Sequence, residues 1–120
     1  MTPGSQVVLR YRDGKTRRAK LVNADVDREV LHIDENGKAD EVPFGTLKAV
    51  FFPQENPDAK LEPAQGSQLA VEFADGEVIR GVAQYNPERN GFFLYPLDRV
   101  KNDRIFVVNS AIASIEVEKL

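Results

Sequence analysis

A short segment occurs twice in this chain of 120 residues. The first copy, GSQVVLRYRDG, spans residues 4–14, and the second copy, GSQLAVEFADG, spans residues 66–76. In both copies apolar residues alternate with other residues, as they do in a half-buried β-strand. Both copies end in Asp-Gly, the dipeptide best suited to the positive φ angles of a tight hairpin turn. The repetition therefore predicts two copies of one small β-structured unit.

The similarity between the two copies continues beyond the hairpin turns. Three further pairs of segments correspond: 15–22 with 77–85, 30–33 with 92–95, and 42–52 with 107–117. The last pair predicts a fourth strand, a tight corner at 44–46 or 109–111, and a short fifth strand. Five short, bent strands per copy predict an all-β fold of two tandem five-stranded barrels of the SH3-like or Sm-like kind, related by an internal repeat.

The segment between the copies, PQENPDAKLEPAQGS at 53–67, differs from both in composition. Its three prolines and polar majority disfavour a regular strand or a long helix. We expect a first barrel at 1–52, a linker at 53–67 and a second barrel at 68–120. We expect the barrels to pack together, because small domains gain stability by sharing a buried interface.

The composition is that of a folded chain, with 42% hydrophobic and 29% charged residues. It contains no apolar run of the roughly 20 residues that a membrane helix needs. The first residues, MTPGSQ, lack the basic and apolar regions of a signal peptide, so we expect a cytoplasmic protein. The absence of cysteine excludes disulfides, thiolate nucleophiles and zinc–cysteine sites. A net charge of -3 disfavours general nucleic-acid binding but allows a local basic patch.

Residues with catalytic or metal-binding chemistry are few. His32 is the only histidine, which excludes a Ser-His-Asp relay in both copies and a centre of several imidazoles. The carboxylates near 25–29 and 34–35 are in predicted turns, where hydration and Asx turns explain them. The turn at 34–37 lacks the remaining ligands of a calcium loop. We expect no enzyme activity, no catalytic residue, no cofactor and no metal.

The strongest local charge signal is RYRDGKTRRAK at 10–20, which holds six basic residues and one acid. We expect these side chains to form a basic face on the first hairpin that could bind phosphates. The candidate binding residues there are Arg10, Arg12, Lys15 and Arg17. The alternative is a solvated hairpin whose charges are balanced by carboxylates across the sheet, such as Glu41 or Glu72.

Aromatic residues gather at 86–111 in the second copy. The candidate interaction residues there are Phe92, Phe93 and Tyr95. Successive strand residues point to opposite faces, so Phe92 and Phe93 cannot both enter one core. We expect one of them at the contact between the copies or at a partner. The alternative is that both are buried within this chain.

Two pairs of motifs carry a resemblance to a known family. RYRDGKTRRA followed by EVPFGTLKAVFF forms the first pair, and FADGEVIRGVAQYNPERNGFFLYPLD followed by NDRIFVVNSAIASIEV forms the second. They resemble the two halves of an uncharacterised bacterial tandem domain built of small β-barrels. The resemblance covers nearly the whole chain. It implies a cytoplasmic protein of unknown function, sometimes associated with cyclic-dinucleotide-binding PilZ domains or signalling modules. It implies no catalytic residue, and the first copy departs from it at Ala19, where glycine is usual.

Two alternatives to a protein partner involve nucleic acid or a nucleotide. The segment 24–28 lies where Sm-like proteins place their RNA-contacting loop, but the typical asparagine and a later basic-glycine pair are absent. Arg17-Arg18 and 25–27 imitate a PilZ motif, but Asp27 replaces the serine and would repel a cyclic dinucleotide. We expect a non-catalytic binding or regulatory module with a protein partner. Nucleic-acid binding through 10–20 is the alternative, and self-association stays open.

Overall fold

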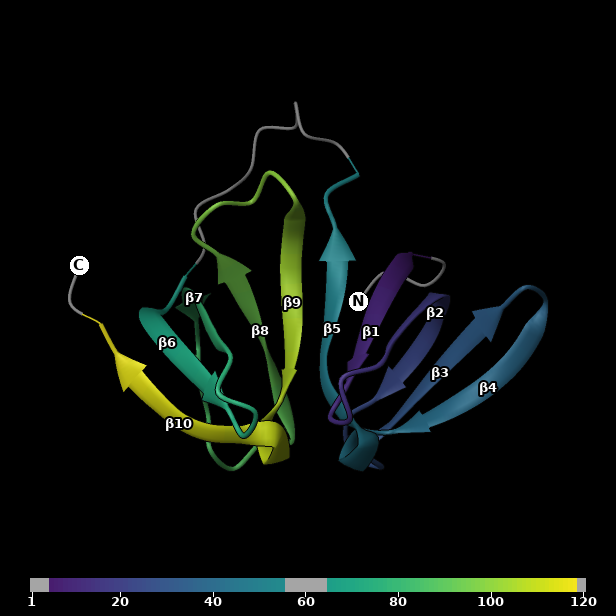
Figure 1. Cartoon of the computed structure of the whole chain (residues 1–120), viewed down its shortest axis with the longest axis horizontal. Coiled ribbons are helices and arrows are strands. Elements are labelled where there is room, and N and C mark those ends of the chain that lie inside the picture. The colour runs from purple at the N-terminus through teal and green to yellow at the C-terminus, as the bar shows by residue number, and fades with distance from the viewer. Residues whose placement is uncertain (1–4, 56–64, 119–120) are drawn as a thin grey trace.

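The computed structural model describes residues 5–55 and 65–118, and Figure 1 shows how they are arranged. These residues form ten strands of one antiparallel sheet. The strands are β1 (Gln6–Tyr11), β2 (Thr16–Asp25), β3 (Val30–Glu35), β4 (Lys38–Pro43), β5 (Leu47–Pro53), β6 (Ser67–Phe73), β7 (Val78–Ala83), β8 (Gly91–Pro96), β9 (Asn102–Val108) and β10 (Ile112–Val117). Two short 3-10 turns, η1 (Phe44–Thr46) and η2 (Asn109–Ala111), occupy the two predicted corners. No described helix is long and apolar enough to cross a membrane.

The two halves of the sheet have the same strand order. The order β5-β1-β2-β3-β4 in the first half corresponds to β10-β6-β7-β8-β9 in the second. The pairing within the hairpins also corresponds, because Val7 pairs with Ala19 and, equally far along the chain, Leu69 pairs with Gly81. A register shift occurs in both halves where the first strand meets the fifth. The equivalence of strand order and hairpin register expected from the repeat is therefore observed.

The third strands correspond with a shift of one residue from the sequence alignment. Leu31 pairs with Val42 on β4, and Phe92 pairs with Val107 on β9. Leu31 is therefore the counterpart of Phe92, whereas the alignment of 30–33 with 92–95 matched Leu31 with Phe93. The turns before these strands differ in length, and sequence similarity alone did not show where the difference fell.

Strands β5 and β9 join the two halves into one continuous sheet. Ala49 pairs with Val107 and Phe51 with Ile105, which leaves β4 and β10 as the outer edges (Figure 1). The structure thus shows an all-β protein with one open sheet. Its division into two closed barrels stays a prediction. Strand β5 ends at Pro53 and β6 begins at Ser67, so both ends of the expected linker are strand residues; 56–64 lies outside the described residues.

A single hydrophobic core extends through both halves. Its buried side chains come from strands of both copies, among them Leu9, Leu31, Val71 and Leu94. Strand β9 is buried on both faces from Ile105 to Val108, because successive side chains enter different halves of the core. Close packing of the two copies, expected from their small size, is therefore observed.

Candidate interaction surfaces

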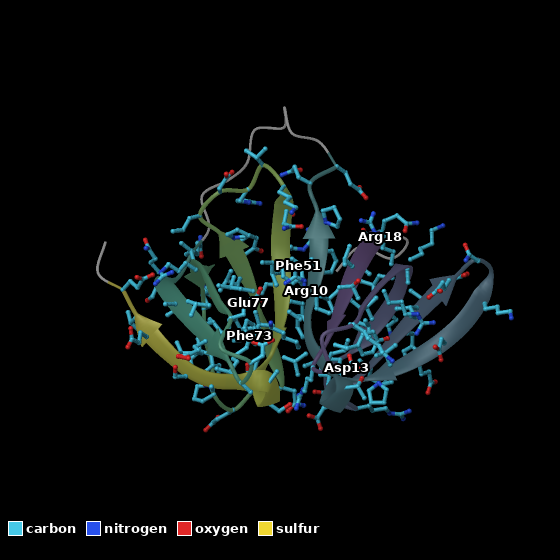
Figure 2. The ribbon with its side chains drawn as sticks, viewed as in Figure 1. Arg10, Asp13, Arg18, Phe51, Phe73 and Glu77 are labelled. Atoms are coloured by element: carbon cyan, nitrogen blue, oxygen red, sulfur yellow. The ribbon has the colours of Figure 1, made fainter. Side chains whose placement is uncertain are left out.

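Arg10 belongs to the contact between the halves. Its Nη1 atom lies 3.1 Å from Oε2 of Glu77, which is just before β7 in the second half. Its guanidinium carbon lies 4.6 Å from the centre of the Phe51 ring, and Figure 2 shows these side chains together. Arg10 is thus neutralised and partly covered by the protein itself, which reduces what it can offer to a phosphate.

Arg12 is also engaged by groups of this chain, although it is exposed. Its Nε atom donates a hydrogen bond to the carbonyl oxygen of Leu47, at 2.9 Å. One of its terminal nitrogens donates to Oγ of Ser110 in η2, at 2.5 Å. Arg12 therefore fastens the first hairpin turn to β5 and to the second half.

Arg17 lies on the opposite face of the hairpin from Arg10. The prediction that four basic residues share one face is therefore wrong for Arg17. Arg17 pairs with Leu9, whereas Arg10 pairs with Thr16, and directly paired residues share a face. In the Asp-Gly turn only Gly14 has a positive φ, of 92°. The turn therefore has a bulge rather than two left-handed residues, and the resulting one-residue shift moves Arg17 to the other face.

On that face Arg17 contacts carboxylates of β3 and β4. Its Nε atom binds Glu35, and its Nη1 atom lies 2.9 Å from Oδ2 of Asp40. The hydrogen bond from Arg17 holds the pKa of Asp40 below its ordinary value. The charges of Arg10 and Arg17 are thus balanced inside the chain, as the alternative expected for the hairpin, but by Glu35, Asp40 and Glu77 rather than by Glu41 or Glu72.

The other basic side chains of the hairpin are exposed. Lys15 is in the turn, while Arg18 and Lys20 pair with Val8 and Gln6 and share their face. Figure 2 shows Arg18 near the upper end of β1 and β2. The structure therefore leaves a smaller basic surface than the sequence predicted.

Lys48 is a buried cation that the sequence analysis did not single out. It is only 6% exposed, its Nζ atom lies 2.6 Å from Oε1 of Glu77, and the same atom lies 4.8 Å from the centre of the Phe73 ring. Burial by itself lowers the pKa of Lys48, but hydrogen bonds to Asp75 and Glu77 outweigh burial and raise it. The signal in the sequence was one lysine inside the apolar run LKAVFF of β5.

Phe93 lies at the contact between the halves, as predicted for one of the two adjacent phenylalanines. Its ring centre is 5.8 Å from that of Phe52 on β5 and 5.3 Å from that of Phe106. Phe92 points to the other face, where it is 6% exposed and its ring contacts Tyr85 at 5.3 Å between centres. Both phenylalanines are thus used within this chain.

Tyr95, the third aromatic candidate, does not join this cluster. It is partly exposed on β8. The guanidinium of Arg99 lies 5.1 Å from the centre of its ring. Tyr95 and Arg99 therefore form a separate contact beside the loop that leads to β9.

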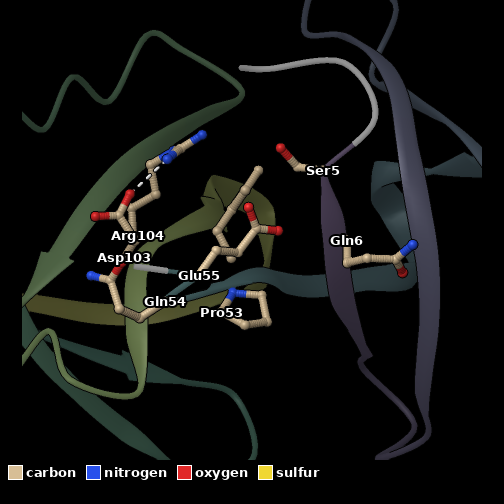
Figure 3. Close-up of a pocket in the computed structure, with 8 residues that line it drawn as sticks. Ser5, Gln6, Pro53, Gln54, Glu55, Asp103 and Arg104 are labelled. Atoms are coloured by element: carbon tan, nitrogen blue, oxygen red, sulfur yellow. Dashed lines mark hydrogen bonds and ion pairs between the residues drawn. The ribbon is translucent and has the colours of Figure 1, made fainter. Parts of the chain in front are cut away.

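A shallow hollow of about 260 Å³ lies beside the end of β5 (Figure 3). Its polar lining includes Ser5, Gln6, Glu55 and Asp103. Arg104, its cation, lies 2.7 Å from Oδ2 of Asp103 and 4.4 Å from the Phe52 ring centre. Because this positive charge is already paired, the hollow does not present it to an anionic ligand.

Side chains that could bind a metal are dispersed. The described residues contain no group of three or more His, Cys, Asp or Glu side chains placed to hold an ion. His32 Nδ1 lies 3.5 Å from Oε1 of Glu41 on the neighbouring strand. In the turn at 34–37, Asp34 accepts a hydrogen bond from the amide of Gly37, at 2.9 Å, which is the Asx-type turn role expected from the sequence.

The two outer edges of the sheet differ in chemistry. Strand β4 reads KADEVP, with exposed side chains at Lys38, Asp40 and Glu41. Strand β10 reads IASIEV, and its Val117 is 71% exposed. In the first half the strand equivalent to β10 is β5, whose corresponding edge is covered by β9.

Comparison with known proteins assigns a family without a function. No curated protein and no solved structure matches the chain. The family described as a family of unknown function, DUF6982, matches residues 4–119. This finding agrees with the resemblance to an uncharacterised family, while bacterial origin and association with PilZ domains stay predictions. Because the match spans nearly all of the sequence, the chain belongs to DUF6982.

Proposed function

We propose that this protein is a non-catalytic binding module that engages another protein through the β10 edge of its sheet. The observation that carries the proposal is the pairing of β10, which is bonded to β6 and has no second neighbour among the described strands. An edge strand presents a row of backbone N–H and C=O groups that can pair with an extended segment of another chain.

The β10 edge is favoured over β4 because β4 carries the features that protect edges from pairing. Lys38, Asp40 and Glu41 are exposed along β4, and Pro43 ends it. Edge charges and proline oppose strand addition. Strand β10 contains no proline, and Glu116 is its one charged residue.

The surfaces favour a protein over nucleic acid as the partner. Arg10, Arg12 and Arg17 are engaged by groups of this chain, so the basic face expected at 10–20 is reduced. The net charge of -3 also opposes binding to a phosphate backbone. Nucleic-acid binding by Lys15, Arg18 and Lys20 is therefore the second candidate.

We further propose that each half of the sheet is a small barrel unit of the SH3-like or Sm-like kind, arranged in tandem. The shared strand order, the matching hairpin registers and the corners at 44–46 and 109–111 support this reading. The family resemblance supports a bacterial, cytoplasmic setting in which such a module regulates another protein.

The proposed edge function is tested by comparing two single-residue changes on opposite edges. Val117→Lys places a charge on β10, and Ala39→Lys places the same charge on β4. The wild-type chain and both variants are used to isolate proteins from lysate of the native host, with mass spectrometry of the bound fraction. A partner kept by wild type and Ala39→Lys but lost with Val117→Lys supports the proposal. An unchanged bound fraction with Val117→Lys, or nuclease-sensitive binding of RNA, contradicts it.

A further inference from the structure

The pairing of β9 with β5 shows the geometry of a strand added to the open edge of β10, because β5 is the counterpart of β10 in the first half. Within the first half, Val50 of β5 pairs with Leu9; within the second, Ile115 of β10 pairs with Val71. Val50 also pairs with Phe106 of β9 on its other side. A strand added to β10 in the same way would run antiparallel to it and place one residue opposite Ile115.

The inner side of β10 is apolar and incompletely covered. Ile115 and Val117 pair with buried residues of β6, so their side chains face the core. Val117 is nevertheless 71% exposed. Its counterpart Phe52, on β5, where β9 covers the edge, is 3% exposed. An added strand with apolar residues opposite Ile115 and Val117 would supply the missing cover.

The outer side of the same edge is acidic. Ser114 pairs with Glu72 and Glu116 pairs with Ala70, so these four side chains share the outer face. Glu118 follows β10, and its backbone amide donates to the carbonyl oxygen of Gln68, at 2.8 Å.

The carboxylate of Glu118 is only partly paired. Its Oε2 atom lies 3.5 Å from Nε of Arg80. Its Oε1 atom is buried and has no hydrogen-bond partner among the described residues. Among the described residues of this outer face, Glu72, Glu116 and Glu118 outnumber Arg80, and this excess of negative charge favours basic residues in a partner.

The chain's own second edge does not fit this position. Strand β4 is the counterpart of β9, and in the register of β9 on β5 it would place Asp40 opposite Glu116. The same register would place Glu41 opposite Ile115, on the apolar inner side. Like charges directly opposite each other destabilise a strand pair, so a second copy binding through β4 is disfavoured.

We propose that β10 binds an extended segment of another protein in which apolar and basic residues alternate. The segment pairs antiparallel with β10, with apolar residues opposite Ile115 and Val117 and basic residues opposite Ser114 and Glu116. This assignment rests on the proposed edge function and adds the chemistry and register of the partner. Backbone pairing supplies affinity, and the two kinds of side chain supply specificity.

Capped synthetic peptides of about eight residues test the assignment with the full chain labelled with ¹⁵N. One peptide alternates valine and lysine, a second alternates valine and glutamate, and a third has the valine and lysine residues in two separate blocks. We expect the first to bind more tightly than the others, with amide shifts concentrated on β10 and β6. Glu116→Lys should weaken this binding about tenfold. Glu88→Lys, the same change in an exposed loop, should leave it unchanged.

Three results would overturn the assignment. They are equal binding of the valine–glutamate peptide, shifts concentrated at 10–20, and a free chain that sedimentation shows to be a dimer dissociated by Val117→Lys. The host experiment keeps the two proposals distinguishable. If Val117→Lys abolishes capture of a partner but the alternating basic peptide binds no better than its controls, the edge function stands and the proposed partner chemistry is wrong.

Discussion

Lys48 Nζ lies 2.8 Å from Oδ2 of Asp75, so a buried cation of the first half is bound by the hairpin turn of the second half. The other oxygen of Asp75 accepts a hydrogen bond from the amide of Glu77, as Oδ1 of Asp13 does from Lys15 in the first turn. The aspartate of the Asp-Gly turn thus accepts a hydrogen bond within its own hairpin in both copies. In the second copy Asp75 also bonds to Lys48 of the first half, whereas in the first copy it is Arg12 of the turn that bonds to Ser110 of the second half.

Removing Lys48 should destabilise the whole sheet. We expect Lys48→Ala to lower the free energy of unfolding by about 2 kcal/mol, because both the packed stem and the bonds to Asp75 and Glu77 are lost. Lys48→Met, which keeps an apolar stem, should lose less. Urea melts measure these changes, with exposed Lys20→Ala as the control expected to stay within about 0.5 kcal/mol. Equal stability of Lys48→Ala and Lys20→Ala would show that Lys48 does not stabilise the contact between the two halves.

Stability should fall in acid partly through Asp75. The hydrogen bond from Lys48 holds the pKa of Asp75 below its ordinary value of 3.8. The stabilisation is therefore present above that value and is lost as the pH falls through the lower folded-state pKa. Urea melts between about pH 6 and pH 2 should show a shallower acid loss for Asp75→Asn than for wild type. Parallel curves for the two proteins would show that the pair does not contribute.

Both adjacent phenylalanines should be needed for folding stability. We expect Phe92→Ala to cost about 3 kcal/mol or more, since this side chain is 6% exposed. We expect Phe93→Ala to cost about 2 kcal/mol, because it removes ring contacts with Phe52 and Phe106 at the junction. Denaturant melts measure both. A Phe93→Ala variant of wild-type stability would instead place this residue among the candidates for partner contact.

Gly81 should not tolerate a methyl group. A Cβ atom there would lie 2.4 Å from the carbonyl oxygen of Tyr95 and 2.5 Å from Cδ2 of Leu94. We expect Gly81→Ala to cost about 2 kcal/mol, because the backbone oxygen cannot move aside without disturbing the pairing of β7 with β8. Gly45→Ala is the matched control, since a Cβ at Gly45 meets nothing within 4 Å. Thermal melts of the two variants should differ clearly, and indistinguishable melts would argue against the close approach.

The elements that depend on local residues were predictable from the sequence. Alternation in 7–11 and 69–73, Asp-Gly turns and the matched corners identified strands and their correspondence between the copies, because strand period and turn chemistry act over a few neighbouring residues. The opposite directions of Phe92 and Phe93 followed from the same period. These inferences needed no knowledge of how the halves meet.

The tertiary structure decided what depends on register and on distant partners. A bulged turn, rather than a two-residue turn, moved Arg17 away from Arg10 and paired it with Asp40, because a shift of one residue exchanges the faces of a strand. The meeting of β5 with β9 made one open sheet, buried Lys48 between the halves and left β10 as an edge. The sequence identifies these residues but does not determine the distances between them, since residues far apart in the chain come together only when the two halves dock.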